Sequence, residues 1–308
     1  MFKHPMMLVA LLVITFSTTA QVNNPVRYKD FVFPNVSKTE DLTYSPGDDK
    51  DQKKAHLFDL YEPAGDKATA RPLIIWMHGG GFKFGSKNAS GIKLWSETFA
   101  KRGYVCVALN YTLSKHYPFL HVDQLLTSAY MAVQDARTAV AYFKKNAKQY
   151  HIDPNKIILG GNSAGGMIAL QAAYTSNAEL GKMAAMPDSI PGTKATEMLK
   201  VAGVINYWGA IFNTDWLKNA RVPIVSVHGS KDGIVPITHK SAPLFGSVSI
   251  HEKADELKIP NDLKIYEGYS HELQRHFNPL FNLGKSTKSR WLEAGQFTAD
   301  FLYANVIK

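Results

Sequence analysis

The sequence predicts an α/β fold in which a mostly parallel sheet is covered by helices on both faces. After Pro63, short and continuously apolar segments alternate with longer segments of helical periodicity. Strands that are apolar on both faces are typical of sheets buried between two layers of helices. The composition agrees, because 45% hydrophobic and 20% charged residues in a chain of 308 are ordinary for a globular protein with a sizeable core.

The first twenty residues are predicted to be a secretory signal peptide. Lys3 gives a basic start, residues 6–16 are almost wholly apolar, and small residues precede the expected cleavage after Ala20. The apolar segment is too short to span a bilayer. We therefore expect a secreted or periplasmic protein without a stable membrane anchor, in which residues 21–308 form a single domain.

An antiparallel edge is expected next, followed by strands and helices in alternation. The edge consists of residues 42–44 and 56–61, joined by a hairpin turn at Pro46-Gly47-Asp48-Asp49. Residues 153–155 predict a turn, and the longest irregular connections are expected at residues 177–196, 238–258 and 272–289. The other expected strands are 73–77, 104–110, 157–159, 201–207, 222–227 and 263–266, and the expected helices are 93–102, 124–149, 164–174 and 291–304.

Charge and cysteine content exclude several classes of function. The net charge is +9, but the lysines are spread along the chain, which indicates a solvated basic surface. No segment resembles a nucleic-acid-binding module, so we expect no nucleic-acid partner. The only cysteine, Cys106, lies in an apolar strand segment and is expected to be a buried hydrophobe. The sequence leaves the oligomeric state open.

A serine stands at a sharp turn between a predicted strand and a predicted helix. Gly161-Asn162-Ser163-Ala164-Gly165 has glycine two residues before and two after the serine. Glycines at these positions avoid collisions of side chains with the strand and the helix. The pattern matches the nucleophile elbow, Gly-x-Ser-x-Gly. Because so short a motif also occurs by chance, its companions elsewhere in the chain decide between a nucleophile and a turn residue.

The companions stand at the ends of other predicted strands, where the sites of open parallel sheets gather. His78-Gly79-Gly80-Gly81-Phe82 follows the strand at 73–77. Asp232 follows the strand at 222–227, and His271 follows the strand at 263–266. Serine, acid and histidine therefore occur in the chain order of α/β-hydrolases.

From about residue 42 to residue 307 the sequence resembles the α/β-hydrolase superfamily. Within it, the His-Gly-Gly-Gly motif upstream of the elbow is similar to that of hormone-sensitive-lipase-like carboxylesterases. The resemblance implies the α/β-hydrolase fold with an eight-stranded sheet, and a serine carboxylesterase. The other histidines show no ligand spacing, so we expect no metal, and we expect no other cofactor. Exported members of this kind include feruloyl and acetyl esterases of plant cell-wall glycans. The expected substrate is therefore a small-molecule ester or an ester linked to a polysaccharide.

The chemistry of ester hydrolysis assigns a role to each of these residues. The hydroxyl of Ser163 needs a base, which we expect to be His271, and Asp232 would fix the tautomer of that histidine. By resemblance, His78 is a structural residue of its loop. The developing oxyanion needs backbone N–H donors, which are expected from Gly80, Gly81 and Ala164.

Other residues compete for these roles. Asp215 follows another predicted strand and could be the acid, although the sequence around Asp232 fits an acid loop after a strand better. His276 and His251 compete with His271. Aromatic side chains near strand ends are expected to line the substrate pocket or to pack in the core, and the expected substrate-binding residues are Phe82, Trp208 and Tyr269.

Lipase-like relatives often carry a helical cap over the site, but this sequence has little material for one. Only residues 209–221 separate two predicted strands at the usual place of a cap. We therefore expect an open site that suits a bulky substrate. An exported peptidase or amidase on the same fold is an alternative function, and a non-catalytic binding protein on a hydrolase scaffold is another.

Overall fold

The computed structural model describes residues 24–45, 54–186, 196–241, 243–278 and 284–308. The predicted signal peptide and the predicted hairpin turn at 46–49 lie outside these ranges. None of the helices in them is long and apolar enough to cross a bilayer.

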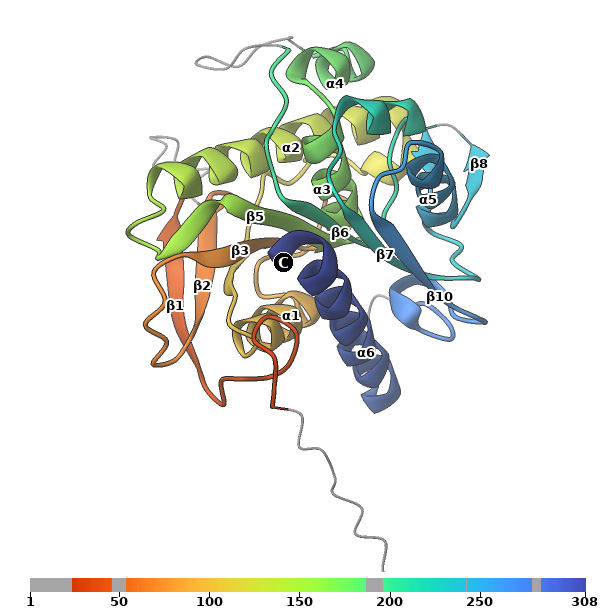
Figure 1. Ribbon diagram of the computed structural model, residues 1–308. Helices are drawn as coiled ribbons and strands as arrows, with labels where there is room; N and C mark the ends of the chain where they lie inside the picture. The colour runs from red at the N-terminus through yellow and green to blue at the C-terminus, as the bar shows by residue number, and fades with distance from the viewer. Residues whose placement is uncertain (1–23, 46–53, 187–195, 242, 279–283) are drawn as a thin grey trace, which may run out of the picture.

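An eight-stranded sheet forms the middle layer of the molecule (Figure 1). Its strand order is β1-β2-β4-β3-β5-β6-β7-β10, and β2 runs antiparallel to its two neighbours while the other neighbouring pairs are parallel. The predicted mostly parallel eight-stranded sheet with an antiparallel edge is thus confirmed. The strands are β1 (Val36–Thr43), β2 (Leu57–Pro63), β3 (Arg71–Met77), β4 (Val105–Leu109), β5 (Ile152–Asn162), β6 (Gly203–Tyr207), β7 (Ile224–Gly229) and β10 (Asn261–Tyr266).

Helices cover both faces of this sheet (Figure 1). The helices α1 and α6 contact each other on one face, and α2 and α3 contact each other on the opposite face. The α-helices are α1 (Ser90–Ala100), α2 (Val122–Lys145), α3 (Ala164–Tyr174), α4 (Asn177–Ala184), α5 (Ser247–Glu256) and α6 (Lys285–Leu302). Short helices are η1 (Pro118–Leu120), η2 (Thr214–Asn219), η3 (His271–Leu273) and η4 (Tyr303–Ile307), and a small hairpin pairs β8 (His239–Ser241) with β9 (Leu244–Phe245).

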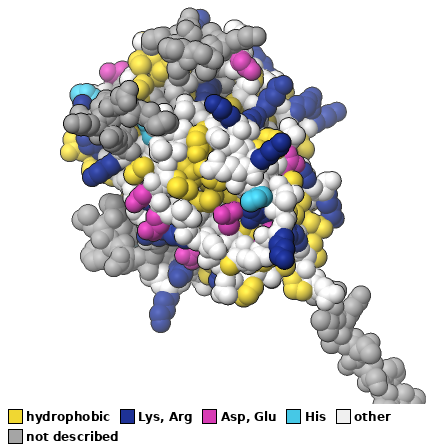
Figure 2. Space-filling model, turned by 90° about the vertical axis from the view of Figure 1, so that its left-hand side faces the viewer, with side chains coloured by type: hydrophobic (Ala, Val, Ile, Leu, Met, Phe, Trp, Pro, Cys, Tyr) yellow, Lys and Arg dark blue, Asp and Glu magenta, His cyan; other side chains and the backbone are white. Residues whose placement is uncertain are grey.

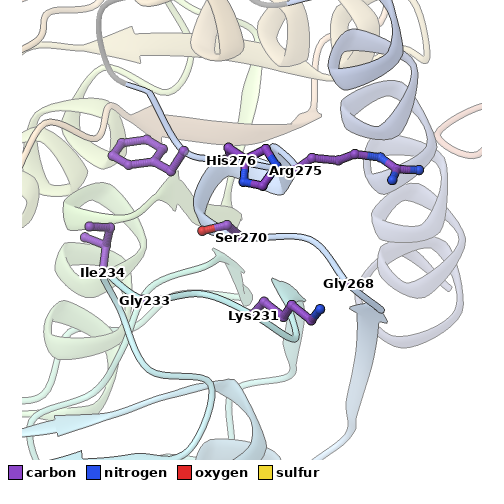
Figure 3. Close-up of a pocket in the computed structure, with 8 residues that line it drawn as sticks. Lys231, Gly233, Ile234, Gly268, Ser270, Arg275 and His276 are labelled. Atoms are coloured by element: carbon purple, nitrogen blue, oxygen red, sulfur yellow. The ribbon is translucent and has the colours of Figure 1, made fainter.

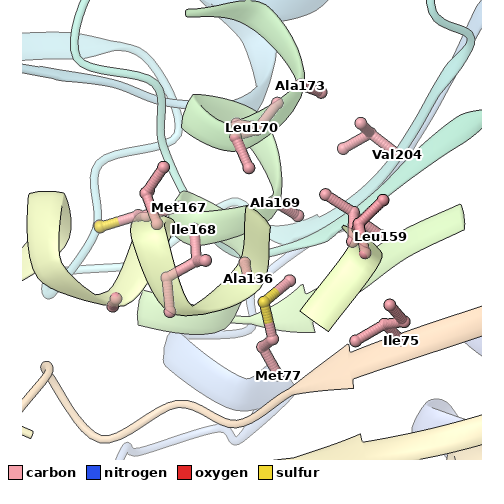
Figure 4. Close-up of a cluster of buried hydrophobic side chains, with 14 of the residues drawn as sticks. Ile75, Met77, Ala136, Leu159, Met167, Ile168, Ala169, Leu170, Ala173 and Val204 are labelled. Atoms are coloured by element: carbon pink, nitrogen blue, oxygen red, sulfur yellow. The ribbon is translucent and has the colours of Figure 1, made fainter. Parts of the chain in front are cut away.

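The core consists of two apolar clusters, one on each face of the sheet. Because neighbouring residues of a strand point to opposite faces, Ile75 belongs to one cluster and Trp76 to the other. The first cluster is mainly aliphatic, and Figure 4 shows Leu159, Val204 and residues of α3 within it. The second is rich in aromatic rings, such as Trp95. Each such side chain stabilises the fold by roughly 1.5–3 kcal/mol when it is fully buried.

The turn predicted at residues 153–155 lies inside strand β5 as an irregularity. Ile152 pairs with Arg71, and the next pair in register is Ile157 with Leu73. The extra residues of β5 therefore bulge from the ladder. Asp153 Oδ1 accepts a hydrogen bond of 2.8 Å from the backbone N–H of Asn155, which is the bond of an Asx turn.

Two of the connections expected to be irregular contain helices instead. Helix α4 begins after Ser176, whose hydroxyl and the carboxylate of Glu179 form a capping box. This Ser-x-x-Glu signal is readable in the sequence. Helix α5 lies within residues 238–258 and buries only a narrow face against the sheet, so its charged residues obscured the apolar pattern.

Basic side chains are distributed over the surface rather than gathered. On the face drawn in Figure 2, Lys and Arg side chains lie scattered around a group of hydrophobic side chains near the middle. This distribution agrees with the solvated basic surface expected from the sequence. It gives that face no continuous positive stripe of the kind that follows a nucleic-acid backbone.

Candidate active site

Ser163 lies between β5 and α3, at the turn predicted from the glycine pattern. Its φ is 52° and its ψ is −119°, a strained conformation for a residue with a side chain. The flanking glycines are required by packing, because a Cβ on Gly161 would lie 2.5 Å from the carbonyl oxygen of Met77, and one on Gly165 would lie closer still. The strained turn therefore fixes the direction of the Ser163 hydroxyl.

The structure brings Ser163, His271 and Asp232 into one hydrogen-bonded chain. His271 Nε2 lies 3.0 Å from Ser163 Oγ, and His271 Nδ1 lies 2.7 Å from Asp232 Oδ2. The carboxylate neighbour of Nδ1 is an acceptor, so Nδ1 carries the proton and Nε2 is free to accept one from the hydroxyl of Ser163. All three side chains are at least nine-tenths buried.

The carboxylate of Asp232 is surrounded by donors. Its Oδ1 accepts hydrogen bonds of 2.9 Å from the backbone N–H groups of Ile234 and Val235. His228 Nε2 lies 3.2 Å from Oδ2. Burial by itself raises the pKa of Asp232, but hydrogen bonds from His228 and His271 outweigh it and hold that pKa well below its usual range. Asp232 is therefore an anion near pH 7.

The glycines of the His-Gly-Gly-Gly loop lie beside Ser163 in the same cleft. Gly80 has φ 112° and Gly81 has φ 62°, a region that favours glycine. A Cβ on Gly80 would lie 2.6 Å from the carbonyl carbon of Phe84, so the loop closes on itself only with glycine there. The backbone N–H of Gly79 donates to Asn162 Oδ1 at 3.1 Å and thereby ties the loop to the elbow.

Ala164 contributes a third backbone donor to this region. It is the first residue of α3, where backbone N–H groups have no partner within the helix. Within the described ranges, no group accepts a hydrogen bond from the backbone N–H of Gly80, Gly81 or Ala164. Together with the partial positive charge at the start of the helix, these donors suit a negatively charged oxygen.

His78 stabilises the glycine loop and is not part of the hydrogen-bonded chain of Ser163, His271 and Asp232. Its Nδ1–H donates to the carbonyl oxygen of Gly79 at 2.7 Å, and the hydroxyl of Tyr111 donates to the carbonyl oxygen of His78 at 2.8 Å. The two rings stack with centroids 4.3 Å apart. Burial lowers the pKa of His78 to about 4, so the side chain is neutral near pH 7.

The competing acid and histidines lie elsewhere. The side chain of Asp215 is 67% exposed and lies 3.9 Å from Lys253. His251 Nδ1 is hydrogen-bonded to Asn261 at 2.6 Å, and His276 is exposed. Over the part of the chain that the structure describes, no three His, Cys, Asp or Glu side chains are grouped as metal ligands.

A cleft of about 780 Å³ opens above Ser163. One wall consists of apolar, mostly aromatic side chains that are unusually exposed to solvent. Leu120 is 73% exposed, Phe84 60% and Tyr117 58%. Large exposed apolar groups around a concave site indicate a binding surface. The side chains that line the cleft include Lys83, Phe84, Tyr117, Pro118, Phe119, Leu120, Asn162, Ser163, Ile234, His271, Glu272, Phe277, Asn278 and Trp291.

The three aromatics expected in the wall lie elsewhere. Phe82 and Trp208 are fully buried, one in each apolar cluster. Tyr269 lies under the guanidinium of Arg290, whose Cζ is 4.1 Å from the ring centroid. Both Phe82 and Trp208 have positive φ, which turns their side chains inward from the strand ends. Position after a strand therefore did not indicate which face of the loop each ring occupies.

Sequence reasoning missed His228, Asn162 and Glu272. His228 ends strand β7 and touches Asp232, and the spacing His-Gly-x-x-Asp was the available signal. Asn162 directly precedes the serine and holds the glycine loop. Glu272 directly follows His271 and lines the cleft, and its backbone has φ 56°. Burial raises the pKa of Glu272.

Comparison with known proteins finds esterases among the relatives of this chain. The chain is 33% identical over 108 residues to venom carboxylesterase-6 of Apis mellifera and 28% identical over 123 residues to esterase LipC of Mycobacterium tuberculosis. These alignments cover 35% and 40% of this chain, but only 18% and 28% of the relatives. The chain thus spans less than a third of the length of either relative.

Two solved structures show the same fold at low sequence identity. Esterase Est2 of Thermogutta terrifontis, with propionate bound, superposes with a TM-score of 0.60 at 20% identity, over 88% of this chain and 94% of that one. A truncated carbohydrate esterase from gut microbiota superposes with a TM-score of 0.52 at 18% identity, over 84% and 96%. The predicted α/β-hydrolase fold is therefore confirmed.

The family is shown by the match of more than half of the chain to one family model. The BD-FAE model matches residues 58–220, which include the glycine loop, the elbow with Ser163 and helix α3. The expected resemblance to α/β-hydrolase carboxylesterases is confirmed by this match and by the named esterases among the relatives. The chain belongs to the BD-FAE family and has the α/β-hydrolase fold.

Proposed function

We propose that this protein is a serine carboxylesterase that works through an acyl-enzyme, with Ser163 as nucleophile, His271 as general base and Asp232 as the acid that orients it. The observation that carries the proposal is the buried chain of hydrogen bonds at 3.0 and 2.7 Å, at the bottom of a cleft. The names of the esterase relatives support the choice of ester bonds.

The first half of the reaction forms the acyl-enzyme. Ser163 Oγ attacks the ester carbonyl while its proton passes to His271 Nε2, and Asp232 stabilises the imidazolium that results. The carbonyl oxygen becomes an oxyanion and accepts hydrogen bonds from backbone N–H groups of Gly80, Gly81 and Ala164. Each such donor lowers the barrier by roughly 3 kcal/mol. Collapse of the intermediate expels the alcohol, which takes its proton from His271.

The second half repeats these steps with water. His271 removes a proton from a water molecule, which attacks the acyl carbonyl and forms a second oxyanion in the same place. Collapse returns the proton to Ser163 Oγ and releases the carboxylic acid. Because Asp232 stays ionised throughout, it holds the Nδ1 proton of His271 in both halves and never accepts it.

The shape of the cleft supports an ester of a bulky alcohol, such as an acetyl or feruloyl ester of a plant polysaccharide. The described residues of the cleft include no helical cap, and its wall residues are exposed. The rings of Phe84, Tyr117 and Phe119 line the cleft and offer apolar surface against which an aryl or short acyl group can pack. Secretion or a periplasmic location would bring the enzyme to such substrates and is part of the proposal.

Hydrolysis of p-nitrophenyl acetate by purified protein tests the activity, and Ser163→Ala tests the nucleophile. We expect a burst of p-nitrophenol and a loss of kcat of at least about 10⁴-fold in the variant. Thr43→Ala removes the hydroxyl of an exposed residue that does not line the cleft and serves as the matched control. Turnover near the wild-type rate in Ser163→Ala would assign the chemistry to another residue, and turnover of anilides in preference to esters would favour an amidase.

A panel of acetyl, butyryl, octanoyl and feruloyl esters, together with acetylated and feruloylated xylan, tests the substrate class. The open cleft predicts hydrolysis of the xylan esters and poor turnover of the octanoyl ester. Equal rates on all of them would contradict a specialised role on glycans.

A further inference from the structure

A second cavity adjoins the cleft of Ser163. Its volume is about 680 Å³, and it shares Ile234 and Phe277 with the cleft. The other lining residues come from the loop after β7 and from the segment after β10. These two segments also carry Asp232 and His271, so the cavity lies on the histidine side of the cleft.

The geometry of proton transfer relates the second cavity to one half of the substrate. The leaving oxygen must face His271 Nε2 to receive its proton. The ring of Phe277 lies edge-on to that of His271, with centroids 5.0 Å apart. An alcohol part that extends past His271 therefore runs along Phe277 and Ile234 into the second cavity. The acyl part remains along the aromatic wall beside the glycine loop.

The far side of the second cavity is cationic. Figure 3 shows Ile234 and Gly233 on one side of it, while Lys231 and Arg275 extend toward the other. His276 lines it as well, and its described lining residues include no Asp or Glu. No ion pair among the described residues includes Lys231 or Arg275, and Arg275 Cζ lies 5.8 Å from the centroid of the Tyr269 ring. Two cations that line one cavity and have no carboxylate partner attract an anionic ligand.

The nearby acid does not cancel this charge. Glu272 lines the cleft and not the second cavity. Asp232 is buried and already engaged with two histidines and two backbone N–H groups. The charged side chains that line the second cavity are therefore Lys231 and Arg275.

We propose that the second cavity binds the alcohol part of the substrate and selects one that carries a carboxylate, as in the uronic acid units of an acidic glycan. The inference rests on the proposed esterase function. Lys231 and Arg275 would hold the carboxylate, while Ile234 and Phe277 pack against the apolar face of the ring between the carboxylate and the ester.

A pair of model esters tests the subsite. 4-Acetoxybenzoate and 4-acetoxybenzamide differ in the charge of the alcohol part, and the ratio of their kcat/KM values is compared between proteins. In Lys231→Ala/Arg275→Ala we expect the ratio to fall about tenfold, mainly through KM of the anionic ester, as two exposed cation contacts predict. Lys67→Ala/Lys218→Ala removes the same charge from exposed sites outside both cavities and should leave the ratio within twofold.

The outcomes separate the subsite from the activity. An unchanged ratio in the cavity variant, or an equal loss on both esters, would overturn the subsite and leave the esterase standing. If the wild type hydrolyses neither ester nor p-nitrophenyl acetate, the proposed function fails. Binding of 4-hydroxybenzoate by calorimetry then decides the subsite, since loss of binding in the cavity variant alone supports it and equal binding overturns it.

Discussion

Two buried carboxylates, Asp59 and Asp232, differ in the residues that surround them. Both side chains are inaccessible to solvent. Asp59 on β2 is paired with two lysines, because Lys87 Nζ lies 2.5 Å from Oδ1 and Lys38 Nζ lies 3.0 Å from Oδ2. Asp232 faces two histidines and two backbone N–H groups.

The difference distinguishes a structural charge from the one to which we assign a role in the proposed reaction. Lysines keep their charge near pH 7, so the group around Asp59 has one protonation state and serves to hold the loop after His78 onto the edge of the sheet. Burial alone raises the pKa of Asp59, but hydrogen bonds from Lys87 and Lys38 outweigh it and lower that pKa. The partners of Asp232 include His271, a group that can gain and lose a proton during a reaction.

The largest expected effect is on Asp232→Asn. The amide cannot stabilise the imidazolium or hold the Nδ1 tautomer of His271, so kcat should fall about 10⁴-fold. The free energy of unfolding should change by only about 1 kcal/mol, because the amide oxygen still accepts the N–H groups of Ile234 and Val235. Ester hydrolysis and urea unfolding measure the two quantities. A loss of stability that parallels the loss of activity would contradict a chemical role.

Asp59→Asn should lower the stability of the fold and leave the activity nearly unchanged. It removes one of the two carboxylates that pair with Lys87, whose side chain is only 6% exposed, and leaves Asp41 Oδ1 at 2.8 Å from Nζ. The lost buried partner should lower the free energy of unfolding by about 2 kcal/mol. At a temperature well below the melting point, kcat should stay within about twofold of the wild type. Asp153→Asn, at an exposed turn, is the matched control for the amide substitution. A 100-fold loss of kcat in folded Asp59→Asn would erase the distinction between the two acids.

The pH dependence of stability includes contributions from two buried histidines, His251, whose pKa burial also lowers, and His78. The folded-state pKa of His78, about 4, lies below the unfolded value of 6.5, so the unfolded chain binds more protons between these values and stability falls with falling pH. The loss should be about 2 kcal/mol between pH 7 and pH 5. The lowered pKa values of Asp59 and Asp232 act only below about pH 4, where their unfolded forms are protonated.

Replacement of His78 by Asn checks this assignment. The Asn amide can donate to the carbonyl oxygen of Gly79 but does not titrate. Urea unfolding at pH 7, 6 and 5 should therefore show a flatter profile in the variant than in the wild type. His116→Asn replaces an exposed histidine and should leave the profile unchanged. Parallel profiles in all three proteins would mean that His78 does not titrate in this range.

The smallest expected effect comes from a substitution in the aromatic wall, which is expected to contact the substrate only through apolar side chains. The ring of Phe119 approaches Gly81 so closely that a Cβ there would lie 3.0 Å from it. Phe119→Ala should lower kcat/KM for a butyryl ester about fivefold relative to an acetyl ester, as the loss of one apolar contact predicts. Met131→Ala, on the exposed side of α2, is the control. An equal effect on both esters would place the acyl group elsewhere.

Much of the molecule follows from local sequence. Glycines around Ser163 and in the loop after β3 are needed for close backbone approach, and such steric needs are visible in a motif of five residues. Continuous apolar strands predicted the sheet, and helix α3 has the predicted bounds. The chain order of serine, acid and histidine could also be predicted, because it depends only on which residue follows each strand.

The tertiary structure alone decided which side chains meet. Phe82 and Trp208 turn inward because their backbone has positive φ, while Phe84, Phe119 and Trp291 converge on the cleft from three separate segments. Likewise, Lys231 and Arg275 lie 44 residues apart in the chain, and only the packing of β7 beside β10 brings their segments to one cavity. Sequence determines backbone preferences over a few residues, whereas the direction of a side chain and its distant neighbours depend on how strands and loops pack.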